Sequence, residues 1–148
     1  MSEAGGGRPH VDRSRARAWA LNVHYRREAE GSDGSFGDTL ARTLESRLVA
    51  ERRRPHLERI VNALDRHREE IDRTLEEALD NWRLDRLSSI DRGVLRIAVA
   101  EMLHLDDVPP KVALQEAIRL AERYGGDESA RFVNGVLDAV LRSLPARS

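Results

Sequence analysis

Residues 106–138 read DDVPPKVALQEAIRLAERYGGDESARFVNGVLD, and this stretch decides the fold. It places a double proline, an amphipathic helix, a glycine stop and a second helix in close succession. The residue before a proline is steered away from α geometry, so Asp107-Val-Pro-Pro ends one helix, and Pro110 can open the next. Gly125-Gly126 closes that helix. A last helix is predicted over residues 129–144.

The rest of the chain also shows helical periodicity, and no sustained alternation of β-branched residues appears. Helices are expected over residues 12–30 and 37–50, the second burying Leu40, Leu44 and Leu48 at four-residue steps. After Pro55, apolar residues continue at helical spacing as far as Trp82. They predict either one long helix or two helices with a break near His67.

Further along, Ser88 stands three residues before the acid Asp91, which is typical of a helix N-terminus. We therefore predict an all-α, compact single-domain bundle of six or seven helices over residues 12–145. A flexible Gly-rich tail is expected over residues 1–11, and a short C-terminal tail over 146–148.

The composition restricts the class of protein. The 148 residues are 40% hydrophobic and 34% charged, with a net charge of −1 and no cysteine. Near-neutral charge argues against a protein that coats nucleic acid indiscriminately, so any RNA contact must be local. The absence of cysteine excludes disulfides, and no apolar run is long enough to span a membrane. A cytoplasmic protein is the expectation.

Positive charge is concentrated at the N-terminus, where residues 1–27 hold six arginines against Glu3 and Asp12. On a helix, Arg13, Arg17 and two further basic residues, His24 and Arg27, fall within an arc of about 80°. Arg15 and Arg26 point elsewhere and broaden this basic end. It is either a solvated helix surface or a cationic contact for RNA phosphates, and the sequence leaves both interpretations open.

The start of the last helix carries an aromatic residue outside its apolar arc. At 100° per residue, Phe132 lies roughly 40° beyond the edge of that arc, beside Arg131. Phe132 could cap the core against a neighbouring helix, or it could stack on an RNA base while Arg131 meets phosphate. Asn134-Gly135 follows, and the glycine is expected to allow close approach of another helix.

No catalytic constellation competes with an RNA-binding function. The five histidines show no i,i+4 pairing and no pattern of metal-ligand spacing, and Gly5-Gly6-Gly7 follows no strand. Paired acids such as Glu69-Glu70 point 100° apart on a helix and are expected to be solvated. We therefore expect no enzymatic activity, no metal and no cofactor.

Several motifs resemble the bacterial transcription antitermination protein NusB family. They are Arg15-Ala-Arg, the block running from Trp82 through Arg86-Leu87 and Asp91-Arg92 to Met102, Asp107-Val-Pro-Pro-Lys-Val-Ala, and Arg131-Phe-Val-Asn-Gly-Val-Leu-Asp. The similarity covers roughly residues 13–144. The resemblance implies an all-α protein that binds single-stranded boxA RNA together with NusE, a small-subunit ribosomal protein. It also implies membership of a transcription elongation complex in which RNA polymerase reads through terminators in ribosomal RNA operons.

The resemblance further implies which residues act. The RNA-binding positions that it transfers to this chain are Arg13, Arg15, Arg17, Arg131 and Phe132. Asp91 is implied, by the same comparison, to lie on the protein-partner face. Some relatives form homodimers that bury the RNA surface, and Ser14 and Ala16 interrupt a basic run that is often denser in the family.

Two other functions stay open beside RNA binding. The chain could be a helical protein-interaction module whose basic end meets an acidic partner. It could also be part of an RNA methyltransferase, because NusB-like domains precede some of those enzymes. The latter would need a glycine-rich cofactor-binding domain, for which we expect no room before Ser148.

Overall fold

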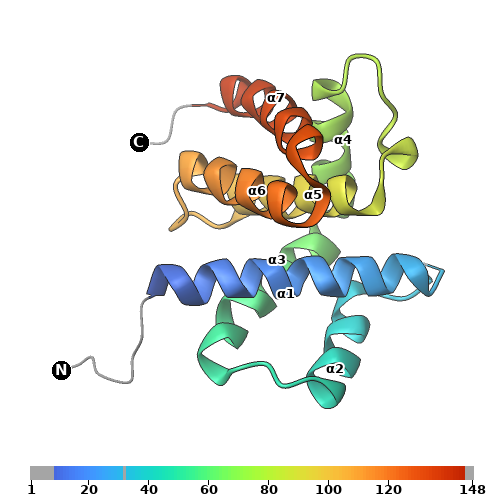
Figure 1. Cartoon of the computed structure of the whole chain (residues 1–148), viewed down its shortest axis with the longest axis vertical. Helices are drawn as coiled ribbons and strands as arrows, with labels where there is room; N and C mark the ends of the chain where they lie inside the picture. Colours follow the sequence, from blue (N-terminus) through green and yellow to red (C-terminus); the bar gives the residue numbers. More distant parts are fainter. Residues whose placement is uncertain (1–8, 32, 146–148) are drawn as a thin grey trace.

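The computed structural model describes residues 9–31 and 33–145, and all regular secondary structure within them is helical, as predicted. The seven α-helices of this part, together with two short 3-10 helices, appear in Figure 1. Their bounds are α1 Pro9–Ala29, α2 Phe36–Ser46, η2 Glu51–Arg53, α3 Arg54–Arg66, α4 Arg68–Ala78, η3 Leu84–Arg86, α5 Ser89–His104, α6 Pro110–Gly125 and α7 Asp127–Ser143.

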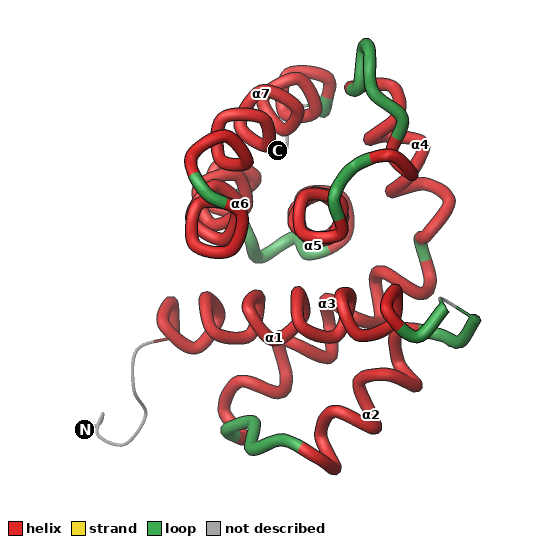
Figure 2. Tube along the Cα trace, turned by 45° about the vertical axis from the view of Figure 1, so that its right-hand side comes forward, coloured by secondary structure: helices red, strands yellow, loops and turns green. Residues whose placement is uncertain are grey.

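Helix α5 is the centre of the bundle. Figure 2 views it almost along its axis, with α4, α6 and α7 around it and α1 beneath. It packs against all four of these helices and against α3. Its predicted apolar residues Val94, Leu95, Ala98 and Met102 are all buried. Helix α1 lies between this group and the pair α2 and α3, so it is covered from two sides.

Helix α1 begins earlier than the sequence pattern indicated. It starts at Pro9 and not at Asp12, because proline fits a first helical turn, where its missing N–H costs nothing. The predicted tail over residues 1–11 is therefore wrong for its last three positions. Its first eight residues, and the predicted tail over 146–148, lie outside the described residues.

Helix α2 is shorter than expected. It is capped at its start by Ser35, whose hydroxyl accepts from the Asp38 N–H, and by the Asp65 carboxylate of α3, which accepts from two backbone N–H groups. It ends at Ser46, and Arg47 is already extended. The four-residue repeat fails beyond that point, so Leu48 is 99% exposed and not buried as predicted.

The apolar series after Pro55 forms two helices, with the break at His67, which caps the end of α3 and the start of α4. This confirms the second of the two predicted arrangements. Trp82 lies beyond the end of α4 at Ala78 and is largely exposed, so its place in the apolar helical series was wrong.

In the C-terminal half, the structure confirms the predicted cap at Ser88 and contradicts the predicted packing at Gly135. Ser88 caps α5 as predicted, since its hydroxyl accepts from the Asp91 N–H at 3.1 Å. A Cβ atom added to Gly135 would meet none of the described residues within 4 Å, so the expected close helix approach at this glycine is wrong. No helix among the described residues has the length and apolar character needed to cross a membrane.

Candidate nucleic-acid interface

Arg17 points into the protein and not toward solvent. Its Nε lies 2.9 Å from both carboxylate oxygens of Glu101 in α5, and its Nη1 donates to Glu116 of α6 at 3.2 Å. Only 4% of its side chain is exposed. The prediction that this guanidinium faces RNA was wrong, because two carboxylates from neighbouring helices hold it inside.

The two members of the predicted basic arc that follow Arg17 on α1, His24 and Arg27, are buried too. His24 is fully enclosed, and burial lowers its pKa to about 4. Arg27 is buried, with its guanidinium carbon 4.1 Å above the centre of the Phe36 ring. The arc that the sequence suggested as a solvent-facing surface is therefore the inward face of α1, because α2 and α5 pack over it.

Glu101 of α5 is a buried acid that was not predicted from the sequence. It is 1% exposed. Its carboxylate forms hydrogen bonds with the Arg17 guanidinium and with His56 Nε2, the latter at 2.7 Å. Its spacing gave a signal: Glu101 follows Val94 and Ala98 on the apolar stripe of α5. A carboxylate at such a position requires a buried cation.

Arg13 lies near the surface and is engaged in an ion pair. Its Nη2 donates to Asp107 at 2.6 Å, and Arg59 of α3 donates to the same carboxylate. Hydrogen bonds from Arg59 and Arg13 hold the pKa of Asp107 below its usual range. The side chain of Arg13 remains 35% exposed, so it contributes positive charge to the edge of the surface.

Arg15 is the arginine of the predicted N-terminal set that faces solvent without an ion pair or a side-chain hydrogen bond among the described residues. It lines a small hollow together with Arg119 and Arg123 of α6. These two arginines were not predicted, because only the packing of α6 beside α1 brings them to Arg15. We call these three residues the arginine cluster.

An aromatic hollow adjoins the arginine cluster. Arg15 and Tyr124 line this hollow as well as the small hollow that holds the arginine cluster. The other residues around the aromatic hollow include Trp19, Tyr25 and Ile90. Tyr25 and Tyr124 are about half exposed. In such an arrangement, arginines can bind the phosphates of single-stranded RNA, and exposed rings can stack on its bases.

Phe132 borders the next hollow along the surface. It is partly buried and packs against the core, and its ring meets Trp82 edge-on with centroids 5.8 Å apart. Trp82, Arg86 and Ile90 line the same hollow. Arg131 is exposed beside Phe132 and, like Arg86, forms no ion pair in the described part of the chain. Phe132 thus caps the core, and part of its ring is also accessible from the hollow, while base stacking stays a prediction.

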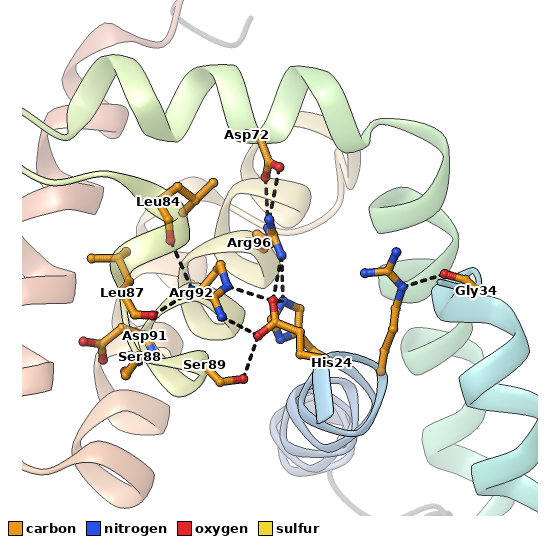
Figure 3. A network of polar contacts seen from close by, with 12 residues as sticks. His24, Gly34, Asp72, Leu84, Leu87, Ser88, Ser89, Asp91, Arg92 and Arg96 are labelled. Carbon is orange, nitrogen blue, oxygen red and sulfur yellow. Dashed lines mark hydrogen bonds and ion pairs between the residues drawn. The ribbon is translucent and has the colours of Figure 1, made fainter. Parts of the chain in front are cut away.

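Asp91 lies in the Phe132 hollow, on the first turn of α5. Figure 3 shows the polar network that fixes this end of the helix. Glu28 of α1 accepts from Arg92 at 2.6 Å and from Ser89 at 2.8 Å. Burial raises the pKa of Glu28, but the Arg92 hydrogen bond, nearby positive charge and Ser89 outweigh it and lower the pKa to about 2. One oxygen of Asp91 is buried without a hydrogen-bond partner among the described residues.

The three hollows join into one surface. Arg15 and Tyr124 are shared by the first and second, and Ile90 is shared by the second and third. This surface, which we call the arginine–aromatic track, runs from the arginine cluster to Phe132. Arg15, Phe132 and Asp91 all line this surface. Arg13 lies outside it in an ion pair with Asp107, and Arg17 is buried.

Known proteins that resemble this chain belong to one family. The chain matches the model of the NusB family over residues 14–142. A transcription antitermination protein NusB of Anaeromyxobacter sp. (strain Fw109-5) is 46% identical over 138 residues, which cover 91% of this chain and 93% of that protein. Another, from Chloroherpeton thalassium, is 46% identical over 89 residues, covering 60% of this chain and 42% of that protein.

A solved structure gives the same fold. The crystal structure of the antitermination factors NusB and NusE in complex with double-stranded RNA contains a chain that is 29% identical. The match covers 90% of this chain and 98% of that one, with a TM-score of 0.79.

Proposed function

The chain belongs to the NusB family of transcription antitermination proteins, and from that membership we propose that it binds boxA-type single-stranded RNA together with NusE. In this role it promotes read-through of terminators in ribosomal RNA operons, as part of an elongation complex with RNA polymerase in the cytoplasm. The observation that carries the proposal is the arginine–aromatic track.

The track has the chemistry of a single-strand site. The arginine cluster provides guanidinium groups for phosphates, and Arg131 provides another at the far end. The track also carries accessible rings on which unpaired bases can stack, from the half-exposed Tyr124 to the partly buried Phe132. A net charge of −1 keeps attraction to RNA confined to this region.

The predicted RNA-binding residues take different roles in this proposal. Arg15, Arg131 and Phe132 contact RNA directly, and Arg13 contributes through the exposed third of its side chain. Arg17 acts from inside, because its bonds to Glu101 and Glu116 connect α1 to α5 and α6. It positions the helix that carries Arg15.

NusE is proposed to bind beside the RNA, at the end of the track that holds Asp91. Support comes from the related complex, in which NusB, NusE and RNA occur together. Asp91 and Phe132 line one hollow, so RNA and protein partner would meet there. A second copy of the chain would compete for the same exposed rings. Light scattering, with and without NusE, distinguishes a monomer from a homodimer.

The direct test is a titration of labelled boxA RNA and a scrambled RNA of equal length, at several salt concentrations, with and without NusE. We expect boxA to bind more tightly than the scrambled strand, and its affinity to fall steeply with salt because phosphate contacts release counterions. Equal affinities in all conditions would contradict sequence-specific binding. That result would favour a helical protein-interaction module instead.

A further inference from the structure

We propose that His67, Glu70 and His104 form a binding site for a divalent transition-metal ion of the zinc class. None of the three residues lines the arginine–aromatic track. The proposal is therefore independent of the proposed RNA-binding function. No local spacing pattern in the sequence marks this site, because His104 ends α5 whereas His67 lies between α3 and α4.

The ligand atoms already lie close together. Each residue offers one donor atom, and the three donors lie within 4.8 Å of one another. Glu70 Oε1 is 3.9 Å from His67 Nδ1 and 2.8 Å from His104 Nε2. Two nitrogen or oxygen ligands of a tetrahedral zinc ion are separated by roughly 3.4 Å, given bonds of about 2.0–2.1 Å. The two distances to Glu70 bracket that value.

The chemistry of the donors suits zinc and related ions. Two imidazole nitrogens beside one carboxylate favour zinc over calcium or magnesium, which prefer sites made of oxygen ligands. Three protein ligands would leave a fourth position for water. One donor also lacks a hydrogen bond: His104 Nε2 is buried and forms none among the described residues, although Glu70 Oε1 lies 2.8 Å from it.

The two imidazoles are stacked, with centroids 3.5 Å apart and ring planes 9° apart. Parallel rings do not aim their nitrogens at one point, so one ring must turn when an ion binds. His67 and Glu70 have room to adjust, since their side chains are 36% and 50% exposed, whereas His104 is 19% exposed. The more buried histidine would stay in place while the two exposed ligands close on the ion.

The position of the site defines its role. His67 separates α3 from α4, Glu70 lies in the first turn of α4, and His104 is the last residue of α5. An ion held by all three would fasten the α3–α4 junction to the end of the central helix. A ligand that binds only the folded chain raises its stability. We therefore infer a stabilising site, separate from the RNA surface.

The test uses the full chain without a histidine tag, freed of metal with a chelator. Zn²⁺ is then titrated by calorimetry, and thermal unfolding is followed with and without Zn²⁺. We expect one equivalent to bind and the unfolding temperature to rise. Glu70→Gln and His67→Asn should each weaken binding by more than about tenfold and abolish the thermal shift.

The chain offers two matched control substitutions, one beside the site and one on another helix. Glu69→Gln removes the neighbouring exposed carboxylate, and His10→Asn removes an exposed histidine on α1; neither should change Zn²⁺ binding. Both site variants change exposed side chains, and circular dichroism of the metal-free proteins confirms that they fold. The proposal is overturned if wild-type protein binds no Zn²⁺, or if the site variants bind it as tightly as the controls.

Discussion

Gly93 of α5 leaves the space that the His24 ring of α1 occupies. A Cβ atom added to Gly93 would lie 2.8 Å from His24 Nδ1 and 2.8 Å from Leu21 Cδ1. Both contacts are shorter than van der Waals contact, and both neighbours are buried. The absence of a side chain at Gly93 therefore sets how closely α1 approaches the central helix.

Gly93→Ala is expected to destabilise the protein by about 1–3 kcal/mol, because an added methyl group forces buried neighbours to move. Urea denaturation measures the effect. Gly135→Ala is the matched control, since it is also a helical glycine but its added Cβ would meet nothing within 4 Å. It should stabilise the fold by up to ~1 kcal/mol. Equal effects of the two substitutions would contradict this account of α1–α5 packing.

Stability should fall as the pH is lowered through the range set by His24. Burial lowers its pKa to about 4, against 6.5 for an unperturbed histidine. Between these values the unfolded chain binds a proton that the folded chain does not, so stability present at pH 7 is lost as the pH falls from 6.5 toward 4. The loss from this one group is on the order of 3 kcal/mol.

Urea denaturation at pH 7, 5.5 and 4.5 tests this prediction. His24→Leu removes the titrating group and should flatten the part of the profile between pH 6.5 and 4. Glu28 contributes separately at lower pH, because its pKa is lowered from 4.5 to about 2 and its stabilisation is lost over that range. An unchanged profile in His24→Leu would show that other groups cause the acid sensitivity.

Arg17→Ala should destabilise the fold strongly. It leaves Glu101 buried without the guanidinium that binds both of its oxygens, and breaking a buried ion pair from one side typically costs about 3–5 kcal/mol. Thermal and urea unfolding measure the loss. His56 remains beside Glu101 and can moderate it. A variant as stable as wild type would contradict the view that Arg17 is the cation on which the buried Glu101 depends.

Arg15→Ala should have the opposite phenotype. Arg15 is exposed, and in the described part of the chain it forms no ion pair, so stability should change by less than about 0.5 kcal/mol. Loss of one phosphate contact should weaken binding to every RNA and reduce the slope of log affinity against log salt by about 1. An unchanged salt slope would remove Arg15 from the proposed RNA track.

The overall fold could be predicted because helix periodicity, prolines and caps are local signals. The all-α class, the break at His67 and the Ser88 cap followed from such signals. Which face of α1 is buried did not follow. A helical wheel shows that Arg17 and Arg27 share a face, but only tertiary packing supplies Glu101, 84 residues away from Arg17, and the Phe36 ring.

The candidate site was predictable to a smaller extent. Phe132 and Arg15 were predicted from their positions and from family resemblance, and the structure places them on adjoining hollows. The prediction that they bind RNA remains to be tested. Arg119 and Arg123 carry no distinguishing local signal, since exposed arginines on a helix are common. They become notable only because α6 lies beside α1.

Phe132 offers a way to separate packing from base stacking. Phe132→Leu keeps apolar volume against the core but removes the aromatic face, whereas Phe132→Ala removes both. We expect both variants to lose roughly 1–3 kcal/mol of boxA affinity. Only Phe132→Ala should lower stability clearly. Trp82→Ala tests the neighbouring ring, which is 59% exposed and meets Phe132 edge-on.

RNA affinity is measured by fluorescence anisotropy at one fixed salt concentration, and stability by urea denaturation of the same preparations. Stacking predicts that Phe132→Leu binds RNA as poorly as Phe132→Ala while unfolding close to wild type. If Phe132→Leu instead binds RNA like wild type, the ring serves the core and not the RNA. Along the described surface of the track, base stacking would then fall to Trp19, Tyr25, Tyr124 and Trp82.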